Sequence, residues 1–259
     1  MAIGSNVLRE RLETREVLIG AAVPFFSADL AEWCGLVGFD WLFLDGEHQA
    51  LGVETCYEMV RAADAVGLAT LVRVPKNDPA TVLSYAESGV DAVMVPHVLT
   101  PPDAARLVSS LRYPPGGVRG ALSTSRAAGY GLPQKPAEYF SDTNRHAMAV
   151  PLLEDAGAMP LAAEITAVDG VDVVFIGPGD LAMSMGHPGQ IDHPEVRDLI
   201  DHAVDAISAT DTPLGTVAGS AEAAIDAIDR GFRLVLVSLG GLMASATRDL
   251  LTTVRNHES

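Results

Sequence analysis

The chain has 259 residues, of which 48% are hydrophobic and 5% aromatic, and its formal net charge is −17. A length of about 250 residues fits one barrel domain or two ordinary domains. Nucleic acid and anionic membranes are disfavoured as partners because both require a basic protein face. Apolar runs fall short of the about 18 residues that a transmembrane helix needs, and the polar N-terminal stretch lacks a signal-peptide core. We therefore expect a cytoplasmic protein.

Short apolar runs, mostly β-branched, recur along the chain and predict strands buried on both faces. They span 17–24, 39–44, 69–74, 92–98, 147–153, 171–176, 214–218 and 234–239. Amphipathic segments between them predict helices over 52–67, 79–89, 101–111, 194–209 and 221–231. Eight alternations favour a single α/β domain over residues 1–259, a (β/α)8 TIM barrel. An open doubly wound sheet with fewer strands is the alternative.

One segment interrupts the alternation. Residues 113–145 are rich in Pro, Gly, Ser and Thr and form a long insertion between two predicted strands. Long loops of this kind either are disordered at the surface or carry function. The segment is therefore either a disordered surface loop or a cover for the site or for a neighbouring subunit's site.

Polar and charged residues follow five consecutive predicted strands. They are Asp45, Glu47 and His48 after the second strand, Arg73 within the third, His97 after the fourth, Glu154 and Asp155 after the fifth, and Gly177, Pro178, Gly179 and Asp180 after the sixth. Catalytic groups of a barrel lie at the carboxyl ends of its strands. Charges beside apolar runs are costly unless they are paired or bind a metal. We expect these side chains to share one site.

Two carboxylates among these strand-end residues predict a metal site. Glu154 and Asp180 follow neighbouring strands, and paired carboxylates with open positions suit Mg²⁺ or Mn²⁺. The alternative is that each pairs with an arginine at the barrel rim. Between them, Gly177-Pro178-Gly179 precedes a helical turn, where backbone N–H groups attract anions. A plain strand-to-helix turn is the alternative there.

His48 and Arg73 are the candidates for moving protons and for neutralising negative charge. His48 follows Asp45 by three residues, so that the carboxylate could orient the imidazole of a general base or acid. The alternative is a rim histidine bonded to a carbonyl. Arg73 lies in an apolar strand, where a substrate carboxylate or enolate oxygen would balance its charge.

Absent motifs narrow the chemistry. The chain has only two lysines, Lys76 and Lys135, and Lys76 lies in a polar turn. A Schiff-base enzyme needs a desolvated lysine, so imine chemistry is disfavoured. Neither Gly-x-Gly-x-x-Gly nor a P-loop occurs, so no nucleotide site is predicted.

The sequence resembles the HpcH/HpaI aldolase family of class II, metal-dependent pyruvate aldolases. The resemblance is carried by residues 38–48, 73–75, 113–115 and 117–120, by Glu154, and by residues 175–181. It implies a barrel of the phosphoenolpyruvate/pyruvate type. It also implies that Glu154 and Asp180 hold a divalent ion, Mg²⁺, Mn²⁺ or Co²⁺, that Arg73 faces the enolate oxygen, and that His48 and Asp45 move protons.

The same resemblance implies further details. Residues Gly177, Pro178 and Gly179 would bind the substrate carboxylate, and Glu47, Glu87, His97 and Arg119 are accessory positions. Glu87 stands where some members have an aspartate that assists the histidine of a neighbouring subunit. A homo-oligomer, normally a hexamer, is implied. Departures such as Asp155 beside Glu154 leave the aldehyde partner open.

Three functions are consistent with these residues. The first is an aldol lyase that cleaves a 4-hydroxy-2-keto acid to pyruvate and an aldehyde through a metal-stabilised enolate. The second is an oxaloacetate-type decarboxylase or an acyl-CoA lyase relative, although no basic cleft for CoA phosphates is visible. The third is a catalytically silent oligomeric barrel. Metal-dependent pyruvate release separates the first from the third.

Overall fold

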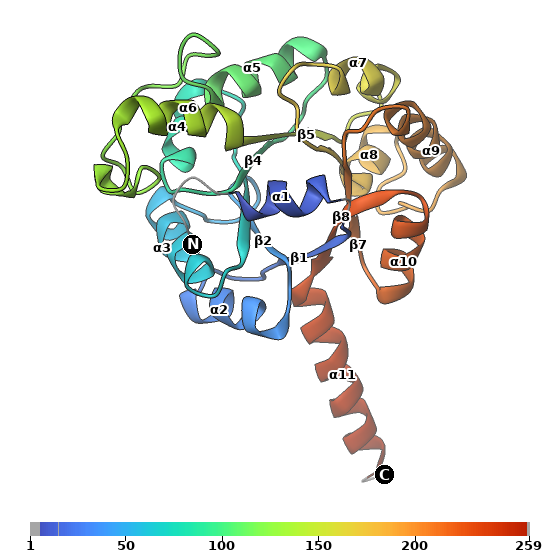
Figure 1. Cartoon of the computed structure of the whole chain (residues 1–259). Coiled ribbons are helices and arrows are strands. Elements are labelled where there is room, and N and C mark those ends of the chain that lie inside the picture. Colours follow the sequence, from blue (N-terminus) through green and yellow to red (C-terminus); the bar gives the residue numbers. More distant parts are fainter. Residues whose placement is uncertain (1–5, 15, 258–259) are drawn as a thin grey trace.

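The computed structural model describes residues 6–14 and 16–257, so residues 1–5, 15 and 258–259 of the expected domain lie outside the described part. Parallel strands close into a barrel in sequence order (Figure 1). They are β1 (Leu18–Ala22), β2 (Trp41–Asp45), β3 (Ala69–Arg73), β4 (Ala92–Val95), β5 (Met148–Leu153), β6 (Val174–Ile176), β7 (Leu214–Ala218) and β8 (Phe232–Ser238). The predicted (β/α)8 barrel is confirmed, and the open sheet is excluded because β8 pairs with β1.

The strands are buried on both faces, which explains their continuous apolarity. One set of side chains packs outward against the helices, and another fills the barrel interior with residues such as Trp41 and Phe175. Two glycines make this filling feasible, because each is the register partner of one of these rings on the adjacent strand. A Cβ at Gly20 would lie 2.2 Å from the Trp41 ring, and one at Gly215 would lie 2.3 Å from the Phe175 ring. The interior is a packed core and not a pore.

Helices surround the barrel (Figure 1). They are α2 (Ala28–Val37), α3 (Val53–Ala65), α4 (Pro79–Ala86), α5 (Pro101–Leu111), α6 (Pro136–His146), α7 (Ala162–Thr166), α8 (Pro178–Ser184), α9 (Pro194–Ser208) and α10 (Ala221–Asp229), with short 3₁₀ turns η1 (Gly129–Gly131) and η2 (Met159–Leu161). Two of these helices have side-chain caps at their N-termini: Asp78 accepts the N–H groups of Ala80 and Thr81, and Asp103 accepts the N–H of Thr100. These contacts satisfy backbone donors that a helix leaves free.

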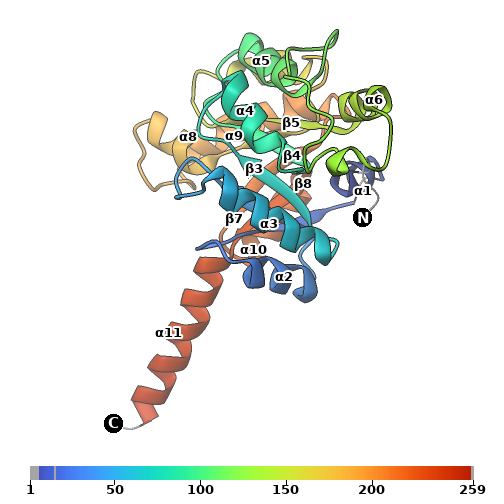
Figure 2. The same ribbon diagram turned by 90° about the vertical axis from the view of Figure 1, so that its left-hand side faces the viewer.

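A short first helix closes the amino end of the barrel. Leu8 and Leu12 of α1 (Val7–Glu13) are buried and belong to the interior cluster. The preceding Asn6 donates from Nδ2 to the carbonyls of Asp91, which directly precedes β4, and of His146, which lies two residues before β5. In Figure 1 the helix crosses the mouth of the barrel, and Figure 2 shows it on the side away from α8. The carboxyl end is therefore the open one.

The segment 113–145 is more ordered than a plain loop, because it ends in helix α6 and packs through arginines. Arg119 is buried, donates to Glu87 Oε1 at 2.8 Å and lies 4.8 Å from the centre of the Tyr113 ring. Arg126 pairs with Asp64 on α3 and donates to the Ser88 carbonyl. These contacts fix the segment against α3 and α4.

The last helix leaves the body of the molecule. Both views show α11 (Leu239–His257) projecting away from the barrel (Figures 1 and 2). Apart from Leu239 at its start, no residue of this helix is buried. Its exposed large apolar side chains are Leu242, Met243, Leu250, Leu251 and Val254. Within residues 6–14 and 16–257, none of the helices is both long and apolar enough to cross a membrane.

Candidate active site

The site lies at the open carboxyl ends of neighbouring strands. Asp45 ends β2 and is the register partner of Arg73, which ends β3. His97 follows β4, Glu154 follows β5, and Gly177 follows β6 as the N-cap of α8. Parallel strands with this order bring all five positions to one rim, as the sequence predicts.

A buried ion network joins the ends of β2 and β3. Arg73 donates from Nε and Nη2 to the two oxygens of Asp45, at 3.0 and 2.7 Å. Its Nη1 lies 3.2 Å from Glu47 Oε2. Burial alone would raise the pKa of Asp45, but the guanidinium outweighs burial and holds that pKa below its ordinary value. Both residues therefore stay charged in a position that is largely removed from water.

His48 is placed differently from the expectation. Asp45 Oδ1 accepts the backbone N–H groups of Glu47 and His48, at 3.0 and 3.3 Å, and not a proton of the imidazole. The nearest carboxylate oxygen to the ring is Glu47 Oε2, 3.7 Å from Nε2. Both Asp45 oxygens are already engaged by Arg73, so that the carboxylate orients the loop that carries His48. The imidazole itself is 60% exposed.

Glu154 is the most deeply buried carboxylate of the site. Its side chain is 2% exposed, and its Oε1 accepts the backbone N–H of His97 at 2.9 Å. The His97 ring lies between Glu154 Oε1, 3.3 Å from Nδ1, and Glu47 Oε1, 3.2 Å from Nε2. Burial raises the pKa of Glu154 above its ordinary value. A cation placed beside it would lower the cost of its charge.

Gly177 allows the loop after β6 to approach Glu154 closely. A Cβ at Gly177 would lie 3.1 Å from Glu154 Cβ and 3.3 Å from Oε2. Pro178 and Gly179 begin α8, and Asp180 lies in the first turn of that helix with its side chain exposed. Over the described residues, neither Glu154 nor Asp180 forms an ion pair with an arginine.

The donor set fits a divalent cation. Among the described residues, the buried carboxylate of Glu154 pairs with no arginine or lysine, and Glu47 Oε2 is a buried oxygen whose contacts are ion pairs, such as that with Arg73 Nη1 at 3.2 Å, and not hydrogen bonds. Carboxylate oxygens are the ligands that Mg²⁺ and Mn²⁺ prefer. Burying such oxygens without compensation costs free energy, which a bound cation would offset.

Two of the predicted accessory residues contact each other. Glu87 and Arg119 pair with each other at 2.8 Å, and both side chains are largely buried. Glu87 follows α4, and its carbonyl accepts the hydroxyl of Tyr57. Within this chain neither residue contacts His48. The pair anchors the segment 113–145 to the barrel.

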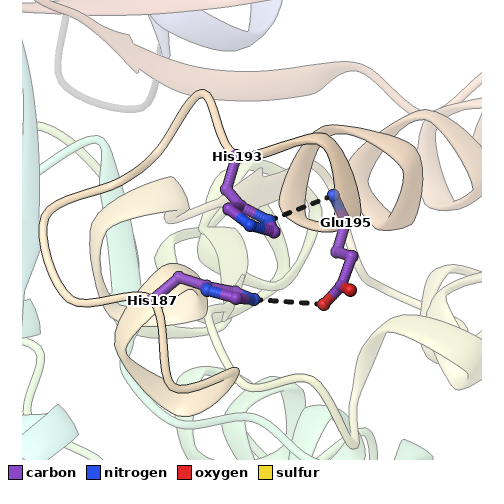
Figure 3. A group of neighbouring side chains, drawn as sticks. All are labelled: His187, His193 and Glu195. Carbon is purple, nitrogen blue, oxygen red and sulfur yellow. Dashed lines mark hydrogen bonds and ion pairs between the residues drawn. The ribbon is translucent and has the colours of Figure 1, made fainter.

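A second cluster of side chains that could bind a metal ion is visible only in the structure. His187, His193 and Glu195 lie at the loop between α8 and α9 (Figure 3). The imidazoles stack at 3.6 Å, His187 Nε2 lies 3.1 Å from Glu195 Oε2, and Glu195 donates its N–H to His193 Nδ1. These contacts cap α9 and use the lone pair of His193 Nδ1. The spacing His-x5-His-x-Glu was the available sequence signal.

Comparison with known proteins adds to this geometry. A family model described as HpcH/HpaI aldolase/citrate lyase matches residues 19–245. The 5-keto-4-deoxy-D-glucarate aldolase of Salmonella arizonae is 34% identical over 255 residues, covering 98% of each chain. A protein of the same name from Escherichia coli is 33% identical, covering 96% of this chain and 97% of the relative.

Solved structures agree. A HpcH/HpaI aldolase/citrate lyase family protein from Burkholderia cenocepacia superposes with a TM-score of 0.92 at 32% identity, covering 97% of this chain and all of that one. An HpcH/HpaI aldolase from Desulfitobacterium hafniense gives 0.90 at 25% identity, covering 97% of each chain. The matches span the barrel and every residue of the carboxyl-end site.

Proposed function

This chain belongs to the HpcH/HpaI aldolase/citrate lyase family, and from that premise we propose that it is a metal-dependent aldol lyase. It cleaves the carbon–carbon bond of a 4-hydroxy-2-keto acid and releases pyruvate and an aldehyde. The observation that carries the proposal is Glu154, a buried carboxylate at the open end of the barrel that pairs with no arginine or lysine among the described residues and is linked through His97 to Glu47 of the Arg73 network. Such a group needs a cation.

Glu154 and Asp180 are the proposed ligands of that cation. Mg²⁺, Mn²⁺ or Co²⁺ would suit these oxygen donors, because such sites select weakly among them. When bound, the ion supplies a Lewis acid toward the carboxylate and keto oxygens of the substrate. The N–H of Gly179, in the first turn of α8, would receive the substrate carboxylate, whereas the N–H of Gly177 donates to the Leu153 carbonyl at 3.0 Å.

Arg73 would neutralise the negative oxygen that develops during cleavage. Its side chain is held from two sides by Asp45 and Glu47, so that no reorganisation is required when the charge forms. Preorganised donors of this kind supply several kcal/mol of transition-state stabilisation. Arg73 is thus proposed as the electrostatic partner of the enolate oxygen.

His48 is the proposed proton carrier. The hydroxyl proton at C4 leaves, the bond between C3 and C4 breaks, and its electron pair remains on the enolate, which takes a proton at C3 to give pyruvate. The exposed imidazole of His48 can reach both the site and bulk water. Lysine chemistry is disfavoured because Lys76 and Lys135 are both exposed, whereas a Schiff-base lysine lies in a desolvated pocket.

The curated relatives suggest the substrate class. Their name, 5-keto-4-deoxy-D-glucarate aldolase, designates an acidic sugar-derived keto acid. We propose a substrate of the same class for this chain, with Arg73 and the cation balancing its negative charge in an acidic protein. We also propose a homo-oligomer, in line with the expected hexamer, because the apolar side chains of α11 have no cover within one chain.

The test is a panel of 4-hydroxy-2-keto acids, including 5-keto-4-deoxy-D-glucarate, assayed for pyruvate release with added Mg²⁺ or Mn²⁺. Turnover of at least one member supports the proposal. Oxaloacetate belongs in the panel, because decarboxylation without any aldol cleavage would replace the lyase by a decarboxylase. No turnover of any member by the metal-loaded protein would leave a silent barrel.

A further inference from the structure

The loop between α8 and α9 brings two histidines and a glutamate together (Figure 3). One ring nitrogen of His187, one of His193 and a carboxylate oxygen of Glu195 all lie within 4.8 Å of one another. The closest pair is His187 Nε2 and Glu195 Oε2, at 3.1 Å. Metal bonds of about 2.1 Å place two ligands about 3.0 Å apart at a right angle and about 3.4 Å apart at a tetrahedral angle. The observed separation therefore suits two ligands of one ion.

Backbone hydrogen bonds hold this loop at both histidines. His187 donates its N–H to the Ala182 carbonyl at 2.8 Å, and His193 donates its own to the Gln190 carbonyl at 3.0 Å. Between them Gly189 has a φ of +73°, in the left-handed region that favours glycine. The backbone positions of the two histidines are thus set before any ion arrives, which lowers the entropic cost of binding one.

The two rings are stacked, and each points one nitrogen toward Glu195 (Figure 3). Their centroids lie 3.6 Å apart and their planes differ by 16°. His193 Nδ1 accepts the Glu195 N–H at 3.3 Å, which is longer than most hydrogen bonds of this kind. To share an ion, the rings must turn out of the stack so that their lone pairs converge, and a bond to the ion replaces this long contact. The His187 and Glu195 side chains are 22% and 70% exposed, and exposed side chains change rotamer readily.

The carboxylate of this cluster is available to a cation. Among the residues that the structure describes, Glu195 pairs with His187 and with no arginine or lysine. Arg197, two residues further along α9, lies against Asp192 and Asp226 instead. A cation between the two rings and the carboxylate would therefore meet an opposite charge without displacing a basic side chain.

We propose that His187, His193 and Glu195 bind one transition-metal ion, with Zn²⁺ as the ion that suits them best. Two imidazoles and a carboxylate are a ligand set that zinc takes, with a fourth position left to water. Mg²⁺ would bind weakly there, because it prefers oxygen donors. The ion would clamp the loop that joins the end of α8 to the start of α9. None of the three residues belongs to the carboxyl-end site, so this metal is distinct from the one in the proposed function.

The test is a calorimetric titration with Zn²⁺ of the tag-free, full-length Glu154→Gln protein, because this variant lacks a ligand of the proposed catalytic ion. We expect it to bind one Zn²⁺ per chain. Adding His187→Ala should weaken binding at least about a hundredfold, since the loss of an outer-shell partner alone costs about 10–100-fold. His193→Ser should have the same effect while its hydroxyl still caps α9. His202→Ala removes an exposed histidine of α9 and is the control, which should leave the affinity unchanged.

Unfolding temperatures give a second readout. Zn²⁺ should raise the temperature at which the Glu154→Gln protein unfolds, and His187→Ala should remove that rise, because only the folded state brings the ligands together. Glu195→Gln, at the most exposed of the three positions, should lower the Zn²⁺ affinity without disturbing packing, and it repeats the test if a histidine variant fails to fold. The inference is wrong if the Glu154→Gln protein binds no Zn²⁺, if its affinity survives the loss of His187, or if His202→Ala weakens binding equally.

Discussion

Arg73 joins three features of the site: the buried Asp45, the loop carboxylate Glu47 and the space in front of Glu154. Its contact with Asp45 uses both oxygens of the carboxylate, an arrangement that a lysine cannot reproduce. The side chain therefore has two roles that can be separated, one in stability and one in turnover.

We expect Arg73→Ala to lower turnover by about 10²–10³, because one preorganised donor to a developing negative charge is lost. The value of kcat should fall more than KM rises, and Arg73→Lys should recover only part of the rate. Steady-state kinetics of the pyruvate-forming reaction measure this. Arg106→Ala, which removes an exposed arginine paired with Asp103, is the control. Near-normal turnover in a folded Arg73→Ala protein would make Arg73 a structural residue only.

Asp45 gives a prediction with a definite dependence on pH. Arg73 lowers its folded-state pKa despite burial, so the pair stabilises the fold fully above the ordinary aspartate pKa of 3.8. This contribution disappears as the pH falls through the lowered value. Asp45→Asn should therefore cost about 3 kcal/mol of unfolding free energy at pH 7, and the difference should shrink towards pH 3. Urea unfolding across this range measures it.

The exposed Asp29 provides the matched control for that experiment. Asp29→Asn should change the unfolding free energy by less than about 0.5 kcal/mol at every pH. A cost for Asp45→Asn that stays constant from pH 7 to pH 3 would show that the lost stability does not come from the ion pair.

At the residue level, the sequence predicts where charged groups gather but not how they pair. Asp45, Arg73, Glu154 and His97 were expected at one rim because each ends or follows an apolar strand. The contact between Asp45 and Arg73 depends on the register of β2 against β3, which sequence spacing does not contain. For the same reason the sequence predicts a contact between Asp45 and the imidazole of His48, three residues away. The actual side-chain partner of Asp45 is an arginine on the neighbouring strand.

Among the elements of the site, the turn between β6 and α8 is set by close packing. Gly177 lies against Glu154, where a Cβ would need neighbouring atoms to move by a few tenths of an ångström. The turn therefore links Glu154, the proposed metal ligand, to the start of α8, the helix that carries Asp180.

We expect Gly177→Ala to displace Glu154 and to weaken binding of Mg²⁺ or Mn²⁺ by about tenfold or more, with a matching loss of turnover. Calorimetric titration and pyruvate assays measure the two effects. The control is Gly52→Ala at the N-cap of α3, where an added Cβ meets no atom within 4 Å. Unchanged metal affinity in Gly177→Ala would separate this turn from the metal site.

The sequence predicts the strands and helices that have a strong apolar pattern, but it does not predict those that lack one. Every predicted strand is present, with ends that differ by no more than four residues, because burial on both faces leaves a continuous apolar run. Helix α6 was missed because its sequence is polar and follows a segment rich in Pro and Gly. Helix α11 was missed because it begins Leu239-Gly240-Gly241, and glycines near a strand end resemble a turn.

At the scale of the whole molecule, the barrel is closed at its amino end by α1 and carries α11 away from its body (Figure 2). Exposed apolar side chains on a projecting helix are costly in water unless another surface covers them. This arrangement supports the proposed homo-oligomer.

We expect the purified protein to be oligomeric, and removal of residues 239–257 to reduce its size. The double variant Leu250→Glu/Val254→Glu should have the same effect while retaining the helix, because it places charges on the apolar face. Light scattering coupled to size-exclusion chromatography measures the mass. The proposal about α11 is wrong if the native protein is monomeric or if both variants keep the native mass.

The dependence of pyruvate release on a divalent ion tests the central claim most directly. Exhaustive chelation should abolish pyruvate release from the substrate that the panel identifies, and Mg²⁺, Mn²⁺ or Co²⁺ should each restore it. Glu154→Gln should remain inactive whichever ion is added, because it lacks the buried carboxylate. Full turnover after chelation, or a Glu154→Gln protein as active as the native one, would contradict the account of this site.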